Sequence, residues 1–450
     1  MPMSVTGASN VLVPTVDLMV YVFFVVLAVG LVSLIMSKKF NVSYIPLFMF
    51  LGILVGPVLG LLNRGLANEL FNYVRVFGLV MILFTEGHTL SWKMLKRNLK
   101  TILTLDTVGL LLTAFIIGGI FSWLFRVPFI VGFLFGAIIA ATDPATLIPL
   151  FRQYRVREDI ETVIVTESIF NDPMGIVLAS VAVAMLVPEA SSARFLEAIA
   201  SYIGLYPAAI IFFLYQMTAS ILIGILLGIV GYGILKRAEV DDFPEIVIFS
   251  LVMAFGGFLL GELVQASGYL VATVTGIVLG NHKVFFKDEI PVVKRVMRAV
   301  EREVHFNESL SAIFTIFIFT LLGASLNPEI IKGHILQGVI IAFFLMLVAR
   351  PLASLPILRW RPFKEYLFIS LEGPRGVVPA ALASLPLTLG ITYNNPDLVQ
   401  WGEIILSVTI ITVLVTVLVE TLWVPILRRK LLEVRSIERE MKRAGYSPRS

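Results

Sequence analysis

The sequence contains no cysteine and few charged residues. Without cysteine no disulfide can form, and nothing more about compartment follows. Asp, Glu, Lys and Arg make up 15% of the 450 residues, whereas about 25% is typical of soluble domains. Residues 1–16 have no Lys or Arg, so they lack the basic start of a secretory signal peptide. The shortage of charge excludes an ordinary soluble domain.

Long apolar runs are what the sequence has instead. Hydrophobic residues make up 58% of the chain, and the mean hydropathy is +0.93. Thirteen runs come near the roughly 20 residues that a helix needs to cross a bilayer. They fall at roughly 17–36, 43–62, 72–90, 101–124, 127–150, 160–187, 202–235, 243–263, 266–281, 308–325, 333–358, 364–390 and 402–427. We therefore predict an all-α polytopic membrane protein with 13 transmembrane helices.

The basic residues predict how these helices are oriented. With residues 1–16 placed outside the cell, 28 of the 35 Lys and Arg residues fall on the cytoplasmic side, as the positive-inside rule requires. Residues 428–450 then form a basic cytoplasmic tail against anionic lipid. Residues 286–304 have the spacing of an amphipathic helix at the same surface. The net charge of +4 reflects these loops, so we expect membrane lipid, and no nucleic acid, as a partner.

The odd number of helices predicts an internal symmetry. Residues 17–187 and 243–427 can each hold six helices, and residues 188–242 form a linker that contains helix 7. The first six helices would begin outside and the last six inside. That arrangement is the inverted-topology repeat found in many secondary transporters.

Predicted helices 5 and 12 are interrupted at corresponding positions. Residues 141–144 break the first and residues 372–376 break the second, and further prolines follow at Pro149 and Pro379. Such interruptions mark broken helices that flank a site near the membrane midplane. Their unwound backbone exposes helix ends, whose dipoles the side chains Asp143 and Arg375 could offset.

The most informative stretch is residues 166–175, in the middle of an apolar run. On a helix Glu167, Ser168, Asn171 and Asp172 fall on one side and form a polar stripe. An ionisable group at this depth is costly and usually marks the path of an ion or a proton. Pro173 has no backbone N–H, so a carbonyl one turn back is left free for another donor or a cation.

Asp172 is the residue that we expect to carry the chemistry. A carboxylate in a dry cavity is neutralised either by a proton or by a cation, so the two compete for one site. The alternative is a structural ion pair with Arg375 or another base. We expect Glu167 to be the structural partner of Arg375, because an unpaired buried Arg is very costly; the alternative for Glu167 is a transport role.

Neutral oxygens near Asp172 suit a weakly held monovalent cation. Ser168 and Thr142 can supply them, although a hydroxyl within a helix often bonds its own backbone instead. Glu86 lies on predicted helix 3 and can line the access path of the ion or bind it through water. The alternative for Glu86 is an ordinary charge at the membrane interface.

Two other classes of protein are less consistent with the sequence. An ion channel needs a pore with a repeated filter, and no such repeat is apparent. An intramembrane protease needs paired aspartates such as Asp143 and Asp172, but the Gly-x-Gly-Asp and Tyr-Asp signatures are absent. We therefore expect a transporter rather than an enzyme, and no cofactor.

Three motifs in order resemble a known family. They are residues 141–144 (Ala-Thr-Asp-Pro), 166–173 (Thr-Glu-Ser-Ile-Phe-Asn-Asp-Pro) and 373–378 (Gly-Pro-Arg-Gly-Val-Val). Together they closely resemble the monovalent cation:proton antiporter superfamily, specifically the electroneutral NhaP-type sodium/proton antiporters related to the sodium/proton exchangers. The resemblance covers essentially the whole chain and implies the NhaA-like antiporter fold.

The resemblance also implies roles for individual residues. Asp172 is then the ion- and proton-binding carboxylate, Thr142 and Ser168 are further sodium ligands, and Glu86 joins through water. In the same pattern Asn171 braces the broken helices with Asp143, and Glu167 bonds Arg375.

The function that follows from the resemblance is antiport. Na⁺ or Li⁺ would be exchanged for H⁺ by alternating access, which would serve pH homeostasis. The ratio would be one ion per proton, because Asn171 stands where the electrogenic branch has Asp. Members of the family are homodimers of the plasma or inner membrane. Predicted helices 1–3 and 8–10 would then form the dimer interface, and predicted helices 4–6 and 11–13 a moving core. The alternatives are a potassium/proton antiporter or a sodium-coupled organic anion carrier of similar fold.

Overall fold

The computed structural model describes residues 16–40, 42–143, 147–189, 193–237, 243–286 and 290–432. Within these ranges every secondary-structure element is a helix. Residues 1–15 and 433–450 lie outside the described part, so the predicted extracellular N-terminus and most of the basic tail do too. Pro144 and the side chain of Pro149, which we expected beyond the first helix break, are likewise not described.

The first half of the chain forms helices that overlap the predicted runs, although α3 and α4 begin earlier and α6 ends earlier than predicted. They are α1 (Val16–Phe40), α2 (Tyr44–Ile53), α3 (Arg64–Thr89), α4 (Trp92–Thr104), α5 (Leu110–Phe125), α6 (Phe129–Ala140), α7 (Leu147–Tyr154) and α8 (Glu158–Leu186). A π-helical turn extends α2 (η1, Leu54–Val58), and another joins α4 to α5 (η2, Leu105–Gly109).

The second half is built in the same way. Its helices are α9 (Ala193–Ile203), α10 (Leu205–Arg237), α11 (Phe243–Leu263), α12 (Gly268–Gly280), α13 (His282–Phe285), α14 (Ile290–Ala324), α15 (Pro328–Phe344), α16 (Arg350–Ser354), α17 (Phe363–Leu371), α18 (Val377–Leu382), α19 (Leu385–Thr392) and α20 (Pro396–Leu427). The turns η3 (Leu345–Ala349), η4 (Leu355–Arg359) and η5 (Arg428–Leu432) complete it.

The apolar helices account for all the predicted membrane runs. Nine helices of the described part are long and apolar enough to cross a membrane, and four shorter apolar helices accompany them. Each predicted run overlaps one of these helices. The protein is thus a helical membrane protein, and the exact number of crossings stays a prediction.

Helix breaks occur where Gly and Pro interrupt the apolar runs. α6 ends at Ala140 and is followed by an extended Ala141, and α17 ends at Leu371, six residues before α18 begins. The predicted amphipathic helix of residues 286–304 is not separate, because α14 runs without a break from Ile290 to Ala324. The side chains of residues 290–302 are not described.

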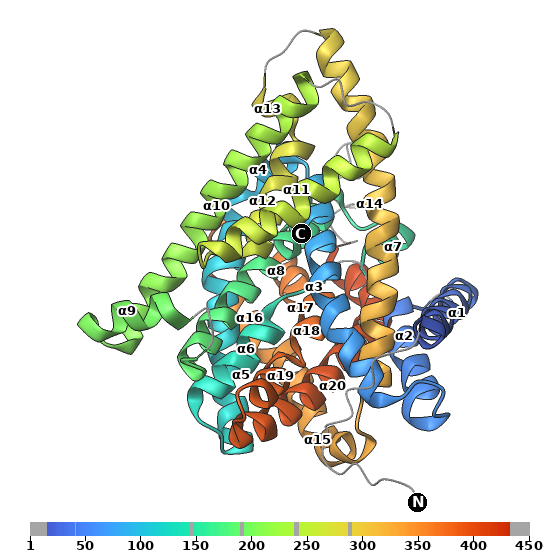
Figure 1. Cartoon of the computed structure of the whole chain (residues 1–450), viewed down its shortest axis with the longest axis vertical. Helices are drawn as coiled ribbons and strands as arrows, with labels where there is room; N and C mark the ends of the chain where they lie inside the picture. Colours follow the sequence, from blue (N-terminus) through green and yellow to red (C-terminus); the bar gives the residue numbers. More distant parts are fainter. Residues whose placement is uncertain are drawn as a thin grey trace, which may run out of the picture.

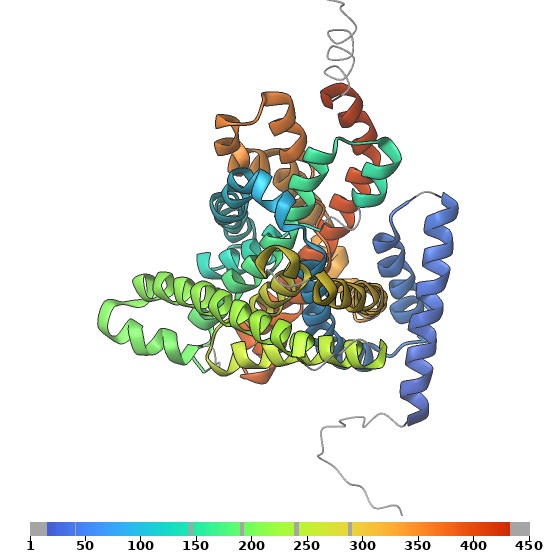
Figure 2. The same cartoon turned by 90° about the horizontal axis from the view of Figure 1, so that it is seen from above.

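Helix α8 lies at the centre of the molecule. Most of its apolar window, 78%, is buried, compared with 22% for α10 and 33% for α1. Figure 1 shows α8 between α10 on one side and α14 on the other, and Figure 2 shows α1 along an outer edge. α10 and α1 therefore present their apolar side chains outward, to lipid or to another subunit, whereas α8 is enclosed by protein.

The packing around α8 relies on close helix contacts. α3 packs against α12 and α14, and α6 packs against α5 and α8. Gly87 on α3 faces the backbone of Thr273, and Gly276 on α12 faces the backbone of Phe84, so a side chain at either glycine would overlap the partner helix. Small residues that let two backbones approach in this way are typical of membrane helix interfaces.

Candidate functional site

A polar stripe crosses the buried middle of α8. Glu167, Ser168, Asn171 and Asp172 are 2%, 1%, 2% and 4% exposed. The helix continues through Pro173, which cannot donate a backbone hydrogen bond to the carbonyl one turn earlier. The side of α8 that the spacing of these residues predicted to be polar therefore lies inside the protein.

Thr142 is fastened to this stripe at the end of α6. Its amide donates to Asn171 Oδ1 at 3.1 Å, and Asn171 Nδ2 donates back to Thr142 Oγ1 at 2.7 Å. The hydroxyl of Ser168 donates to the Thr142 carbonyl. These contacts tie Thr142 and its hydroxyl to the polar stripe that carries Ser168 and Asp172, in the chain segment where α6 has lost its helical backbone bonds.

The two unwound segments meet at Asp143. Its amide donates to the Pro374 carbonyl at 2.8 Å, and its Oδ2 accepts from the Val377 amide at 3.2 Å. Gly376 faces the Asp143 side chain so closely that a Cβ at this position would overlap the carboxylate. The first broken helix thus supplies an acceptor for a backbone N–H of the second.

Arg375, in the second break, bonds the backbone at the end of α6. Its Nη1 donates to the carbonyls of Ala140 and Ala141 at 2.6 and 3.1 Å, at the C-terminal end of α6. Backbone carbonyls at a helix end carry partial negative charge, so a cation there is favourable. The amide of Arg375 in turn donates to Thr416 Oγ1 at 3.2 Å, which ties the unwound segment to α20.

The partner of Glu167 differs from the prediction. Glu167 does not pair with Arg375; it forms a two-pronged ion pair with Arg350, at 2.9 Å (Oε1 to Nη1) and 3.1 Å (Oε2 to Nη2). Arg375 is turned instead toward the end of α6. Asn171 bonds Thr142, the neighbour of Asp143 in the chain. The sequence contained a signal for the correction at Glu167, because Arg350 is a further Arg within an apolar run.

Asp172 is the least satisfied group of the stripe. Within the described residues its Oδ1 has no hydrogen-bond partner, and the same is true of Glu86 Oε2 on α3. Glu86 is close enough to Asp172 for the two charges to interact. An unpaired buried carboxylate oxygen is expensive, so this position calls for a proton or a cation.

Three further buried acids surround this region. Asp106 on η2, Glu372 after α17 and Glu420 on α20 are 1%, 0% and 0% exposed. No role was predicted for any of the three from the sequence, and Glu372 entered only as part of the break at residues 372–376. Their positions within apolar runs indicated that these acids could be buried. Whether they are buried depends on which helices pack around them.

A cavity of about 530 Å³ lies between α3, α8, α12 and α19. Its polar lining includes Arg75, Glu262 and Tyr269, and its apolar lining includes Leu79 and Ile176. Ile176 is one helical turn along α8 from Asp172. The cavity therefore approaches the polar stripe from the end of α8 that carries Leu186.

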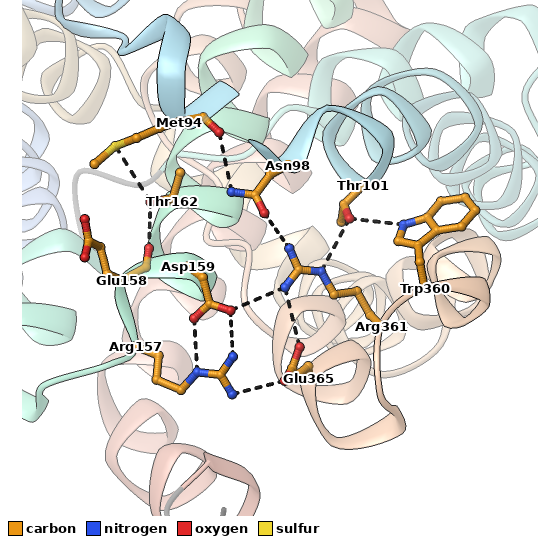
Figure 3. Close-up of polar contacts among 10 residues, drawn as sticks. All are labelled: Met94, Asn98, Thr101, Arg157, Glu158, Asp159, Thr162, Trp360, Arg361 and Glu365. Carbon is orange, nitrogen blue, oxygen red and sulfur yellow. Dashed lines mark hydrogen bonds and ion pairs between the residues drawn. The ribbon is translucent and has the colours of Figure 1, made fainter. Parts of the chain in front are cut away.

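A separate charged cluster lies at the other end of α8 (Figure 3). Arg157 binds both carboxylate oxygens of Asp159, at 3.0 and 2.6 Å, and Glu365 at 3.0 Å. The hydrogen bond to Asp159 raises the pKa of the Arg157 guanidinium. Arg361 donates to Asn98 Oδ1 at 2.6 Å and lies 3.5 Å from Glu365. This cluster joins α4, α8 and α17, and it was not predicted.

The described residues contain no group of three or more His, Cys, Asp or Glu side chains that could hold a resident metal ion. What the site offers is one buried carboxylate with neutral oxygens beside it, at the meeting point of two broken helices. In a protein of packed apolar helices, this combination defines a secondary transporter for a small ion.

Comparison with known proteins identifies the family. The profile described as "Sodium/hydrogen exchanger, transmembrane" matches residues 22–430. The chain therefore belongs to the sodium/hydrogen exchanger family, which confirms the resemblance inferred from the motifs.

Individual relatives agree with this assignment. The chain is 33% identical over 440 residues to "Na(+)/H(+) antiporter 1" of Methanocaldococcus jannaschii, covering 92% of this chain and 97% of the relative. It is 27% identical over 394 residues to "K(+)/H(+) antiporter NhaP" of Alkalimonas amylolytica, covering 84% of this chain and 62% of that protein. The solved structure of the sodium proton antiporter MjNhaP1 from M. jannaschii at pH 8 matches with a TM-score of 0.79 at 31% identity, covering 93% of this chain and 100% of that chain.

Proposed function

We propose that the protein exchanges Na⁺, or Li⁺, for H⁺ across a membrane in a ratio of one to one. The observation that carries the proposal is Asp172, a carboxylate 4% exposed with one oxygen unpaired within the described residues. Membership of the sodium/hydrogen exchanger family supports the same reading. One carboxylate neutralised alternately by a cation and a proton makes the two substrates compete.

The oxygens that would hold the cation belong to Asp172, Ser168 and Thr142. The hydroxyls of Ser168 and Thr142 already make hydrogen bonds, to the Thr142 carbonyl and with Asn171, and each oxygen has lone pairs left for a cation. Glu86 would add its charge through water. A single carboxylate with neutral oxygens suits a monovalent ion that must also be released.

The remaining residues of the site would support it. Asn171 and Asp143 hold the unwound end of α6, and Arg375 binds its last carbonyls. Glu167 is tied to Arg350, so its charge is already compensated. These contacts fix the backbone around Asp172 without occupying its unpaired oxygen.

Coupling would follow from the cost of an empty site. A bare carboxylate at this depth is expensive, so the core moves only when Asp172 carries Na⁺ or H⁺. The cavity that ends near Ile176 would connect the site to one side of the membrane. Alternating access would close this route and open another at the opposite end of α8.

The finer architecture belongs to the same proposal. It comprises thirteen crossings, two inverted six-helix repeats (residues 17–187 and 243–427), a linker of residues 188–242, an outside N-terminus and a cytoplasmic C-terminus. The protein would act as a homodimer in the cell membrane. The apolar faces of α1 and α11, which correspond to predicted helices 1 and 8 and are mostly exposed in the single chain, leave room for such an interface.

Exchange in proteoliposomes tests the function. A pH-gradient dye should report proton movement when Na⁺ or Li⁺ is added, and a weaker response or none with K⁺. Asp172→Asn should abolish the signal while the purified protein keeps its elution volume and melting temperature. Asp397→Asn, which alters an exposed carboxylate on α20, is the control and should leave exchange intact. Retained exchange in Asp172→Asn would remove the proposed carrier.

Potassium is the second candidate cation, because the Alkalimonas relative is named as a K⁺/H⁺ antiporter. A K⁺ response as strong as the Na⁺ response would favour it over the main proposal. A sodium-coupled organic anion carrier would instead show Na⁺ uptake that needs an added anion and moves no protons.

A further inference from the structure

The region where the two broken helices meet contains more buried acids than bases. Six carboxyl groups there are no more than 4% exposed: Asp106, Asp143, Glu167, Asp172, Glu372 and Glu420. Two guanidinium groups, those of Arg350 and Arg375, are 6% and 1% exposed. If every group were ionised, the buried net charge would be 2 − 6 = −4. A surplus of this size cannot be sustained away from water without protons or cations.

Four of the six carboxyl groups have an identified means of compensation. Glu167 is paired with Arg350, and Asp143 accepts the Val377 amide. Both carboxylate oxygens of Glu420 lie 3.1 Å from the Gly373 amide nitrogen. Asp172 is the proposed position of the transported ions.

Asp106 and Glu372 have no such compensation. Both carboxylate oxygens of each residue lack a hydrogen-bond partner within the described part of the chain, although the residues are 1% and 0% exposed. They lie on elements far apart in the sequence: Asp106 on the π-helical turn η2, and Glu372 at the start of the second helix break. An ionised carboxylate in such surroundings would pay its full desolvation cost.

Arg350 lies near both groups, but within the described residues none of its hydrogen bonds goes to the carboxylate of Asp106 or Glu372. Its two Nη atoms bind Glu167, and its Nε donates to the backbone carbonyl of Glu372 at 3.0 Å. The charged groups that act on Asp106 include Glu167 and Arg350, and Asp106 also interacts with Asp172. Those that act on Glu372 are Glu420 and Arg350, and the Trp423 indole N–H points a donor toward its carboxylate but does not reach hydrogen-bonding geometry. In each case a carboxylate stands beside Arg350 and offsets its attraction.

We infer that Asp106 and Glu372 each hold a resident proton, separate from the proton that is exchanged at Asp172. A neutral carboxyl group is far less costly to bury than an ionised one, and it can donate its own hydrogen bond. The resident protons stay in place through the transport cycle. The number of buried acids in this core therefore exceeds the number of protons that it moves.

Infrared spectroscopy of the full-length protein, in ordinary and heavy water, tests the inference. Protonated carboxyl groups give carbonyl bands that shift on deuteration. At mildly alkaline pH and saturating Na⁺, the proton of Asp172 is displaced, so bands that persist report resident protons. Asp106→Asn and Glu372→Gln should each lose one persistent band, and the exposed-site control Asp397→Asn should lose none.

Two results would overturn the inference. One is a wild-type spectrum with no persistent band, a measurement that needs no variant to fold. The other is persistent bands that remain unchanged in both variants.

Transport gives a second readout. Because Asn and Gln match the shape of the protonated acids, Asp106→Asn and Glu372→Gln should keep the proton-to-sodium ratio of the wild type. A changed ratio would show that the proton is transported and would contradict the inference. The inference rests on the proposed function only where Na⁺ is used to displace the proton of Asp172. If Asp172→Asn retained exchange, the proposed function would fail. The bands of Asp106 and Glu372 would still be assigned by their own variants.

Discussion

Glu167 and Arg350 form a buried ion pair between the two halves of the chain. The side chains are 2% and 7% exposed, and both Nη atoms of Arg350 reach the carboxylate, the shorter contact being 2.9 Å. The pair joins α8 to α16, and its partners are 183 residues apart. Arg350 also binds the Glu372 carbonyl at 3.0 Å. It therefore links the helix that carries Asp172 to the second helix break.

The first prediction concerns this pair. Glu167→Gln should lower the stability by about 3–5 kcal/mol, because it leaves the Arg350 charge buried without its partner. Thermal unfolding in detergent measures the effect. The double variant Glu167→Gln with Arg350→Met should recover part of the loss, because no unpaired charge remains.

Combination with Arg375 provides the contrasting case. Glu167→Gln with Arg375→Met should be no more stable than Glu167→Gln alone. If stability were recovered in this double variant and not in the one with Arg350→Met, the pair predicted from the sequence, Glu167 with Arg375, would be the one that stabilises the protein.

The second prediction concerns the hydroxyl ligands. Ser168→Ala and Thr142→Val each remove one neutral oxygen from the proposed cation site. A bond to a charged group contributes about 1.5–3 kcal/mol, so the sodium concentration for half-maximal exchange should rise roughly 10- to 100-fold. Thr412→Val is the matched control, because Thr412 is a buried hydroxyl that, among the described residues, bonds the Val408 carbonyl of its own helix at 2.8 Å and no other group. Equal effects at Thr412 and Ser168 would argue against a ligand role.

The third prediction concerns charge movement. With one Na⁺ exchanged for one H⁺, no net charge crosses the membrane in a cycle. Collapsing the membrane potential of proteoliposomes with a potassium ionophore should therefore leave the rate of exchange unchanged. A rate that follows the potential, at about 2.3 kcal/mol per charge per 100 mV, would require more than one proton per ion.

The fourth prediction concerns the charged cluster of Figure 3. Arg361→Ala removes the bonds to Asn98 and Thr101 and the contacts with Asp159 and Glu365. Because the Arg361 side chain is 13% exposed, the loss should lower the stability by about 1–3 kcal/mol, with little effect on sodium affinity. Thermal unfolding and exchange assays on the same preparation measure both quantities.

Lys332→Ala is the control for this variant. Lys332 lies 3.5 Å from Glu329, but the two side chains are 70% and 83% exposed. Exposed pairs contribute about 0–1 kcal/mol, so this change should leave the melting temperature unaltered. A large shift in sodium affinity for Arg361→Ala would instead place the cluster on the ion path.

The features that the sequence determined by itself are local ones. Apolar runs fixed the positions of the membrane helices, Gly and Pro marked the breaks after Ala140 and Leu371, and helical spacing placed Asn171 and Asp172 on one polar side. Each of these depends on neighbours within a few turns of the same segment. The ordered motifs also indicated the family correctly.

The partners of the buried charges were decided by the tertiary structure alone. Glu167 faces Arg350 rather than Arg375, and Asp106 and Glu372 lie in the same buried region, because helices far apart in the sequence pack together there. Periodicity tells which side of a helix a residue occupies but not which helix will lie against it. A buried charge must find its partner across that contact, so its pairing becomes known only when the helices are assembled.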